Sequence, residues 1–179
     1  MISMKETEVK ILEIDRQKIE QTLVELGAKK VFEGEIQTIF LDFKDSQISK
    51  QESLLRLRKT SKKTELTYKK VKHKQTFKIA EEYTVEVSDL EMMLKILESL
   101  GLSTTGKMEK HRISYKLEKA QFDIDKYTGT YAFIPEFMEI EAEDIDQINK
   151  YVKLFGYNQI NCLPWSTEEV IQHYSKKAT

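Results

Sequence analysis

The protein has 179 residues, with 29 lysines and arginines against 30 aspartates and glutamates, so its formal net charge is −1. This length suits one domain over residues 1–179, and the near-neutral balance does not favour binding to nucleic acid by general phosphate attraction. Cys162 is the single cysteine, which excludes an intrachain disulfide framework and a zinc site built on cysteines. The chain starts without an apolar leader region and holds no run of about 20 apolar residues, so we expect a cytoplasmic protein without a membrane span.

Four segments have the apolar periodicity of amphipathic helices. Three of them start at an aspartate or serine that can cap a helix and stop at a glycine: residues 15–27, 88–101 and 144–156. The fourth starts at Ser166, where Glu169 completes the pattern of a capping box. We expect all four to pack their apolar stripes onto a core.

Between these helices the apolar period changes from 3.6 to 2, which indicates strands. About eight are expected: residues 4–12, 30–42, 53–60, 65–72, 78–88, 107–118, 121–127 and 134–143. They follow one another mostly as hairpins, so the sequence favours an α+β fold with a large antiparallel sheet over a doubly wound one. Residues 72–75 are expected to form a flexible loop.

Six of these strands carry charges on one face and apolar side chains on the other. The charged faces consist of Glu6, Glu8 and Lys10; Arg56 and Arg58; Thr67 and Lys69; Lys110 and Arg112; Asp123 and Asp125; and Glu139 and Glu141. A half-solvated antiparallel sheet shows the same alternation, which is the simplest interpretation of any one strand. For the whole set, two features favour an inward orientation: the polar faces are almost wholly ionic, and the signs segregate by strand.

If the strands form a barrel, the ionic faces line a wet interior and the apolar faces meet the helices outside. Buried charges are costly unless they are paired, so such an interior suits a multiply charged ligand. Its cations would bind the oxygens of a polyphosphate, with arginine giving bidentate contacts. Its carboxylates would hold Mg²⁺ or Mn²⁺, hard ions that also bridge to phosphate oxygens. Such a site is suited to phosphoryl or nucleotidyl transfer.

The motif Glu6-x-Glu8-x-Lys10 resembles the ExExK signature of the CYTH superfamily, the triphosphate tunnel metalloenzymes. Later motifs match in the family's order: Leu55-Arg56-Leu57-Arg58-Lys59, Leu66-Thr67-Tyr68-Lys69, Lys110-x-Arg112-x-x-Tyr115, Asp123-Ile124-Asp125 and Phe137-Met138-Glu139-Ile140-Glu141. The resemblance covers roughly residues 4 to 175. It implies a barrel-like antiparallel tunnel of about eight strands with the helices packed outside.

The resemblance also implies residue roles. Catalysis falls to Glu6, Glu8 and Lys10; metal binding to Glu6, Glu8, Asp125, Glu139 and Glu141; and triphosphate binding to Lys10, Arg56, Arg58, Lys69, Lys110 and Arg112. In the strand at 78–88, Lys78, Glu82 and Glu86 are further candidates that we do not align with a family position.

Two reactions use such a tunnel. In hydrolysis, water attacks the terminal phosphorus of tripolyphosphate, a nucleoside triphosphate such as ATP, or thiamine triphosphate. In cyclisation, the 3′-hydroxyl of ATP attacks the α-phosphorus, as in class IV adenylate cyclases. We expect a metal-dependent triphosphatase, with cyclase as the first alternative and a polyphosphate-binding module without catalysis as the second. The presence of all five predicted metal ligands favours an enzyme. The sequence leaves open a homodimer.

Overall fold

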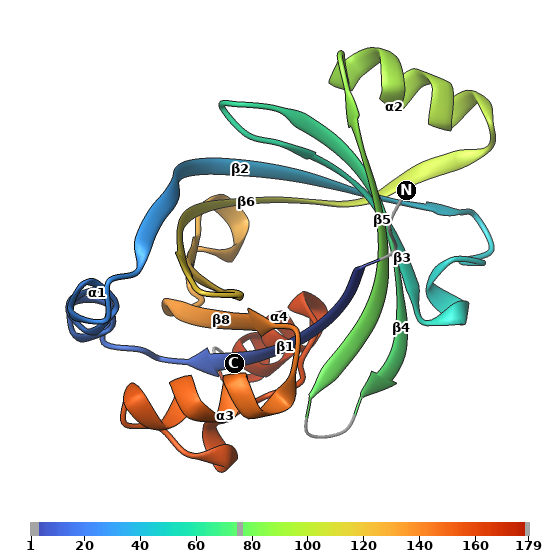
Figure 1. Cartoon of the computed structure of the whole chain (residues 1–179). Helices are drawn as coiled ribbons and strands as arrows, with labels where there is room; N and C mark the ends of the chain where they lie inside the picture. The colour runs from blue at the N-terminus through green and yellow to red at the C-terminus, as the bar shows by residue number, and fades with distance from the viewer. Residues whose placement is uncertain (1–3, 75–76, 178–179) are drawn as a thin grey trace.

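The computed structural model describes residues 4–74 and 77–177, and within these ranges it describes no side chains for residues 4–6, 73, 74 and 177. Eight antiparallel strands close into a ring in the order β1-β5-β4-β3-β2-β6-β7-β8, which confirms the predicted α+β fold and its barrel-like sheet, although the ring is not a regular barrel (Figure 1). The strands are β1 Met4–Leu12, β2 Lys29–Phe43, β3 Ser53–Lys59, β4 Thr64–Lys74, β5 Lys78–Val87, β6 Leu102–Leu117, β7 Ala120–Tyr127 and β8 Phe137–Ala142.

Four α-helices lie between or after the strands, as the apolar periodicity predicts: α1 Arg16–Glu25, α2 Leu90–Ser99, α3 Ile145–Leu154 and α4 Thr167–Lys177. Their predicted caps are present. The side chains of Asp15, Asp89 and Asp144 each accept a hydrogen bond from a backbone N–H of the first turn, which satisfies a donor that has no partner within the helix. Within the described ranges, none of the helices combines the length and the apolar character that a membrane span requires.

The predicted limits are wrong for two strands. β6 begins at Leu102, five residues before the predicted start, because residues 102–106 pair with the end of β2. The polar run Ser103-Thr104-Thr105-Gly106 has the composition of a turn, and only the long partner strand makes it extended. β8 begins at Phe137 and not at 134, because the short 3₁₀ helix η2 (Gly129–Tyr131) and Pro135 precede it. Two more 3₁₀ helices, η1 (Ser49–Gln51) and η3 (Gln159–Asn161), have no counterpart in the prediction.

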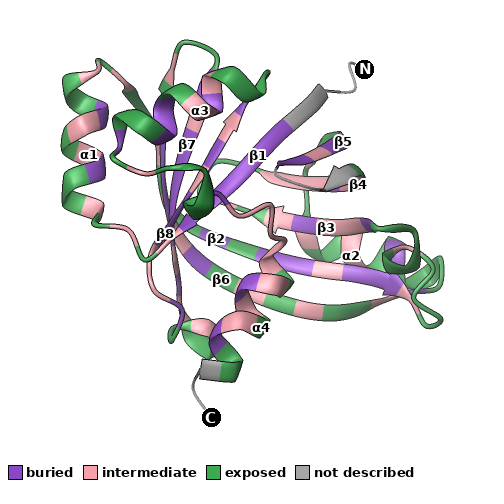
Figure 2. Cartoon of the chain, turned by 90° about the horizontal axis from the view of Figure 1, so that it is seen from below, coloured by how far each residue is buried: buried purple, intermediate pink, exposed green. Residues whose placement is uncertain are grey.

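Two of the apolar clusters of the described residues lie outside the ring. One cluster joins α1 and α3 to the outer faces of β1, β6, β7 and β8, and a second joins α2 to β2 and β3. Figure 1 shows α1, α2 and α3 at the periphery of the sheet, and Figure 2 shows buried residues alternating with less buried ones along several strands. Burial of apolar surface against these helices stabilises the sheet from outside, at about 25 cal/mol per Å², and leaves the ionic faces turned inward.

α4 occupies a different position. It packs through Val170 and Tyr174 on Tyr127 and Phe137, which share the inner faces of β7 and β8 with the charged residues. The segment before α4 is fixed by a two-way backbone pairing of Leu163 with Lys10, both hydrogen bonds being 2.9 Å long. β5 pairs with β1 only as far as Glu8, so Leu163 continues the edge that β5 leaves. This pairing places the start of α4 at one end of the ring.

Candidate active site

The inner faces of the strands enclose one cavity of about 1190 Å³. Cross-strand neighbours in the sheet share a face, and the register places the charged sets on the same side: Lys10 faces Glu139, Glu8 faces Lys78, and Arg112 faces Asp125. The side chains that border the cavity include nine of the eleven predicted site residues: Glu8, Lys10, Arg56, Arg58, Lys69, Lys110, Arg112, Glu139 and Glu141. The ionic faces therefore point into a shared interior and not into bulk water.

Glu8 lies at the centre of a cluster of ammonium groups. Its carboxylate accepts hydrogen bonds from Lys69 Nζ at 3.0 Å and Lys78 Nζ at 2.6 Å, and Lys10 Nζ lies at 3.7 Å. Burial raises the pKa of Glu8, and nearby Glu139 raises it further, but the three ammonium groups outweigh both and lower it to about 2. Glu8 is therefore ionised at neutral pH although its side chain is only 4% exposed.

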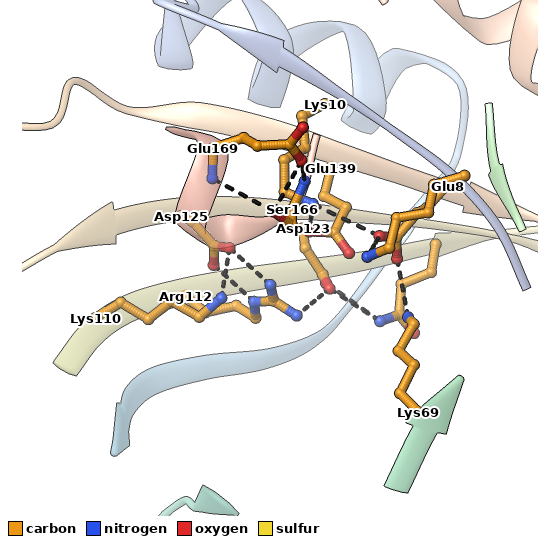
Figure 3. Close-up of polar contacts among 12 residues, drawn as sticks. Glu8, Lys10, Lys69, Lys110, Arg112, Asp123, Asp125, Glu139, Ser166 and Glu169 are labelled. Atoms are coloured by element: carbon orange, nitrogen blue, oxygen red, sulfur yellow. Dashed lines mark hydrogen bonds and ion pairs between the residues drawn. The ribbon is translucent and has the colours of Figure 1, made fainter. Parts of the chain in front are cut away.

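Lys10 connects this cluster to the opposite strand. Its Nζ lies 3.0 Å from Glu139 and 3.7 Å from Glu8, so one ammonium group serves two carboxylates (Figure 3). Burial lowers the pKa of Lys10, but Glu139 and Glu8 outweigh it, and the net shift is upward. Burial also raises the pKa of Glu139, whereas Lys10, Arg112 and other cations lower it well below its usual value. Both carboxylates and the lysine between them are charged.

A second network joins β6 to β7. Asp125 accepts hydrogen bonds at 2.6 Å from Nε and Nη2 of Arg112 and from Nζ of Lys110, while Nη1 of Arg112 donates to Asp123 (Figure 3). Burial raises the pKa of Asp125, but Arg112 and Lys110 lower it to about 2. Burial, together with the charge of Arg112, lowers the pKa of Lys110 to about 7. These two cations are held rigidly by carboxylates of the neighbouring strand.

β3 presents the contrasting pair of cations. Within the ranges that the structure describes, the Nε atoms of Arg56 and Arg58 are buried and have no hydrogen-bond partner. Arg56 reaches Glu82 only at 3.6 Å. Burial and the charges of Arg56 and Arg112 lower the pKa of Arg58 to about 9, because its positive charge is not balanced locally. This part of the cavity has an excess of positive charge that an anionic ligand would balance.

Two predicted metal ligands stand apart from the other nine residues. Glu6 lies in β1 on the face of Glu8, but its side chain is outside the described part of the chain. Asp125 is fully buried, does not border the cavity, and uses both oxygens on Arg112 and Lys110. The lone pairs of Asp125 are directed at cations of the protein, and its role as a metal ligand stays a prediction. The predicted flexible loop at 72–75 is wrong for residues 72–74, which extend β4 and pair with β5, and residue 75 lies outside the described residues. Lys72 pairs with Glu81 at 2.8 Å.

Two residues of the site, Lys78 and Glu82, are among the candidates of the strand at 78–88 that we did not align with a family position. Lys78 donates to Glu8, and Glu82 lies 3.4 Å from Lys69 and 3.6 Å from Arg56. The signal that could have assigned them is alternation, since residues 78 and 82 share one face of β5, and Lys78 pairs with Glu8. Glu86 shares that face, but it is exposed and does not border the cavity.

Of the predicted metal ligands, Glu8 and Glu139 have carboxylate oxygens that suit a hard divalent cation. Glu8 and Glu139 already share one positive charge, that of Lys10, and carboxylate oxygens are the ligands that Mg²⁺ and Mn²⁺ prefer. Among the side chains that the structure describes, which do not include that of Glu6, no three acidic, histidine or cysteine groups are gathered at one point. The reason is visible in the ion pairs, because Lys10, Lys69 and Lys78 draw Glu8 and Glu139 towards themselves. A bound metal would therefore compete with lysines for these carboxylates.

Comparison with protein families gives a match to the CYTH domain over residues 4–157. The chain belongs to the CYTH family. This confirms the resemblance that the ordered strand motifs indicate, and the match covers all eight strands of the ring. CYTH proteins are enzymes, and relatives of this chain carry adenylate cyclase and triphosphatase names.

Three similar proteins show the range of names. A candidate adenylate cyclase of Methanocaldococcus jannaschii, MJ0240, is 28% identical over 150 residues, which cover 84% of this chain and 85% of that protein. The structure of PH1012 from Pyrococcus horikoshii has a TM-score of 0.78 at 23% identity and covers 92% of this chain and 98% of its own. HpAC1 from Hippeastrum, a candidate adenylyl cyclase described as having a dominant triphosphatase activity, has a TM-score of 0.66 at 15% identity and covers 94% and 95%. The two structural likenesses show the CYTH fold.

Proposed function

We propose that this CYTH protein is a divalent-metal-dependent triphosphatase that hydrolyses the terminal phosphate of a triphosphate bound in the cavity. The observation that carries the proposal is the pair of β3 arginines. Their Nε atoms are buried without hydrogen-bond partners among the described residues, and the pKa of Arg58 is lowered to about 9 by burial and by the cations Arg56 and Arg112. An interior that keeps positive charge without a counter-ion fits a polyanionic ligand.

The cations around the cavity fall into two groups with different roles in binding the triphosphate. Arg56 and Arg58 on β3 and Lys69 on β4 bind the phosphate oxygens that enter the centre, where the arginines can make bidentate contacts. Arg112 and Lys110, fixed by Asp125, stabilise negative charge as it develops on the leaving oxygens. Lys10, Lys69 and Lys78 can bind phosphate once a metal ion replaces them as the partner of Glu8 and Glu139.

Glu8 and Glu139, with Glu6 and Glu141 as further predicted donors, would hold Mg²⁺ or Mn²⁺. When bound, such an ion neutralises phosphate charge and orients water. CYTH triphosphate tunnel enzymes generally depend on a divalent metal. In the reaction, water attacks the terminal phosphorus, the bond from that phosphorus to the bridging oxygen breaks, and orthophosphate and the shortened phosphate chain leave. Glu8 and Glu139 are both ionised at neutral pH, so they are ready to hold a cation.

Cyclisation of ATP remains the alternative, favoured by the cyclase name of the Methanocaldococcus jannaschii relative. The dominant triphosphatase activity described for HpAC1 supports hydrolysis in a protein that also carries a cyclase name.

The deciding experiment separates the products of purified protein incubated with ATP and Mg²⁺ or Mn²⁺, and with tripolyphosphate. Orthophosphate and ADP that disappear with EDTA support the proposal. Cyclic AMP with pyrophosphate would establish the cyclase. Tight binding of tripolyphosphate without any product would identify a binding module.

A further inference from the structure

Lys78, the first residue of β5, is a buried cation of the site that the strand motifs do not align with a family position. It lies directly opposite Glu8 in the β1–β5 pair, and its side chain borders the cavity. Its Nζ donates a hydrogen bond of 2.6 Å to Oε1 of Glu8. A carboxylate that we predict to be a metal ligand is therefore covered by an ammonium group of the protein.

The two oxygens of the Glu8 carboxylate have different neighbours. Oε2 accepts a hydrogen bond of 3.0 Å from Lys69 Nζ. Oε1 has Lys78 Nζ at 2.6 Å and Lys10 Nζ at 3.7 Å, and the second distance is too long for a hydrogen bond. Without Lys78, Oε1 would have no hydrogen-bond donor among the described residues. Lys78 is therefore the side chain that any other cation has to displace from Oε1.

Lys78 also differs from the other two lysines in its carboxylate partners. Each of the others has a second carboxylate within 3.4 Å: Lys10 has Glu139, and Lys69 has Glu82. In the described part of the chain, the structure shows one carboxylate partner for Lys78, which is Glu8. Lys10 and Lys69 can lose Glu8 and keep a counter-ion, whereas Lys78 needs a new anion when it leaves Glu8.

A divalent metal and a triphosphate have opposite effects on this balance of charge. A metal ion that displaces Lys78 leaves a buried ammonium group without a counter-ion and adds further positive charge beside it. A triphosphate supplies the missing anion, because Lys78 borders the same cavity as Arg58 and has a flexible stem that lets its ammonium group move. Each ligand therefore lowers the free-energy penalty of binding the other.

We propose that Lys78 is a positioning residue that couples metal binding to triphosphate binding: it holds Glu8 until a triphosphate takes up its ammonium group, and Glu8 is then free to bind Mg²⁺ or Mn²⁺. This inference rests on the proposed function, which supplies both ligands, and it adds how the site is regulated. The coupling is reciprocal, so bound triphosphate raises the affinity for metal by the factor by which bound metal raises the affinity for triphosphate.

The first measurement is the dissociation constant of Mn²⁺ for the protein without triphosphate, from the electron paramagnetic resonance signal of free Mn²⁺. Lys78→Met removes the ammonium group and keeps the length of the side chain. We expect the variant to bind Mn²⁺ at least about fivefold more tightly than wild type, which is the lower end of the usual range for coupling between two sites. Glu8→Gln, added to Lys78→Met, should abolish this gain and so locate the ion at Glu8.

The second measurement repeats the Mn²⁺ titration on protein loaded with one equivalent of a triphosphate whose bridging oxygens are replaced by imido groups, so that it resists hydrolysis. The quantity of interest is the factor by which the analogue tightens Mn²⁺ binding. This factor should be at least about fivefold smaller in Lys78→Met than in wild type, because the variant has no ammonium group to displace. Direct contact between Mn²⁺ and the analogue contributes to both proteins alike.

Three further variants control for the charge, the fold and the position of the lysine. Lys78→Arg keeps a cation beside Glu8 and should bind Mn²⁺ as weakly as wild type. Lys78→Gln keeps a hydrogen-bond donor without the charge, should behave like Lys78→Met, and replaces it if the methionine variant does not fold. Lys72→Met is the matched control, because Lys72 pairs with Glu81 at 2.8 Å across β4 and β5 but does not border the cavity. It should leave the Mn²⁺ affinity unchanged, and the melting temperature of each variant checks the ring of strands.

The inference is overturned if a folded Lys78→Met or Lys78→Gln variant binds Mn²⁺ no more tightly than wild type, since Lys78 then only joins β5 to β1 or only binds phosphate. It is also overturned if the analogue tightens Mn²⁺ binding by the same factor in the variant and in wild type. Failure of the proposed function has a different signature: Mn²⁺ and the analogue bind with the expected coupling, but wild-type protein releases no orthophosphate from tripolyphosphate or ATP when Mn²⁺ is present.

Discussion

Two parts of the cavity wall hold arginines in opposite ways. On β6, Arg112 makes two hydrogen bonds of 2.6 Å to Asp125 and a third to Asp123, both on the adjacent strand β7. On β3, Arg58 lies beside Thr38 of β2 and Glu65 of β4 in the sheet, yet its side-chain Nε is buried and has no hydrogen-bond partner among the described residues. Arg112 has its carboxylate partners within the protein. Arg58 carries a positive charge that the protein does not balance locally and that a ligand could balance.

The difference between the two walls distinguishes side chains that are held in place before a ligand binds from side chains that contribute mainly to the affinity for the ligand. The β6–β7 network keeps Arg112 and Lys110 in place before a ligand arrives, so little reorganisation is needed when phosphate charge develops beside them. On β3, Arg58 gains most from a ligand, because binding supplies a counter-ion to its buried charge, whereas Arg56 already lies 3.6 Å from Glu82. Between the two walls, Lys10 joins Glu8 to Glu139 and connects both to the proposed chemistry.

The largest expected effect is at this connection. Glu139→Gln keeps the shape of the side chain and removes the charge that Lys10 and a divalent metal would share. We expect kcat for triphosphate hydrolysis to fall by about a hundredfold or more, the size of effect seen when one electrostatic group of an active site is removed. Steady-state kinetics at saturating Mg²⁺ measures it.

Glu86→Gln is the matched control for that variant. Glu86 shares the inner-face register of β5 with Glu82, but it is exposed and does not border the cavity, so its kcat should equal that of the wild type. Wild-type turnover in Glu139→Gln, or equal losses in both variants, would refute the assignment of the carboxylates.

The next largest effect tests the β6–β7 network. Asp125→Asn leaves Arg112 and Lys110 buried with a neutral partner, and removal of one side of a buried ion pair typically costs about 3–5 kcal/mol. We expect the free energy of unfolding in urea to fall by that amount. Glu143→Gln is the control, because its pair with Lys119 is 2.7 Å long but exposed, and solvent screens such a pair so that it contributes little to stability. Equal losses at the two sites would mean that the network does not stabilise the fold.

Much of this arrangement was predictable from residue alternation. Arg56 and Arg58 alternate with leucines, and Asp123 and Asp125 with Phe122 and Ile124, so one inward and one outward face follow from the period of the strand. Helix limits followed from side chains that act locally, such as the capping aspartates Asp15, Asp89 and Asp144.

Properties that depend on tertiary pairing were not predictable. Alternation places Asp125 on the inner face but cannot say that Arg112 and Lys110 engage both its oxygens, since that depends on the β6–β7 register. The approach of Lys78 to Glu8 likewise depends on the pairing of β5 with β1, two strands far apart in the sequence. The early start of β6 depends on the length of β2, and a local reading of Ser103-Thr104-Thr105-Gly106 gives a turn.

Acid should weaken the β6–β7 network in wild-type protein. The pKa of Asp125 is lowered from 3.8 to about 2, because the hydrogen-bonded cations outweigh burial. Below about pH 4 the unfolded chain takes up a proton that the folded chain does not, so stability falls as the pH falls towards 2. A shift of this size corresponds to about 2 kcal/mol at this residue. Urea unfolding at pH 5, 4 and 3 should show the decline, and Asp125→Asn should show a shallower one. Identical slopes would contradict this origin of acid sensitivity.

The smallest expected effect separates the two arginines most directly. Arg58→Met removes a buried charge without a local partner, so the free energy of unfolding without ligand should be unchanged or higher by about 1–2 kcal/mol. Arg112→Met removes the arginine from Asp123 and leaves Asp125 with Lys110 alone, so it should lower the free energy of unfolding. Added tripolyphosphate should stabilise wild-type protein by about 2.7 kcal/mol at a hundred times its dissociation constant, and it should stabilise Arg58→Met much less.

Lys59→Ala, an exposed change at the end of β3, controls for general loss of positive charge. Denaturant titrations with and without tripolyphosphate give all the values. If Arg58→Met destabilises the free protein as strongly as Arg112→Met, the contrast between a satisfied and an unsatisfied arginine is wrong, and Arg58 has a structural role.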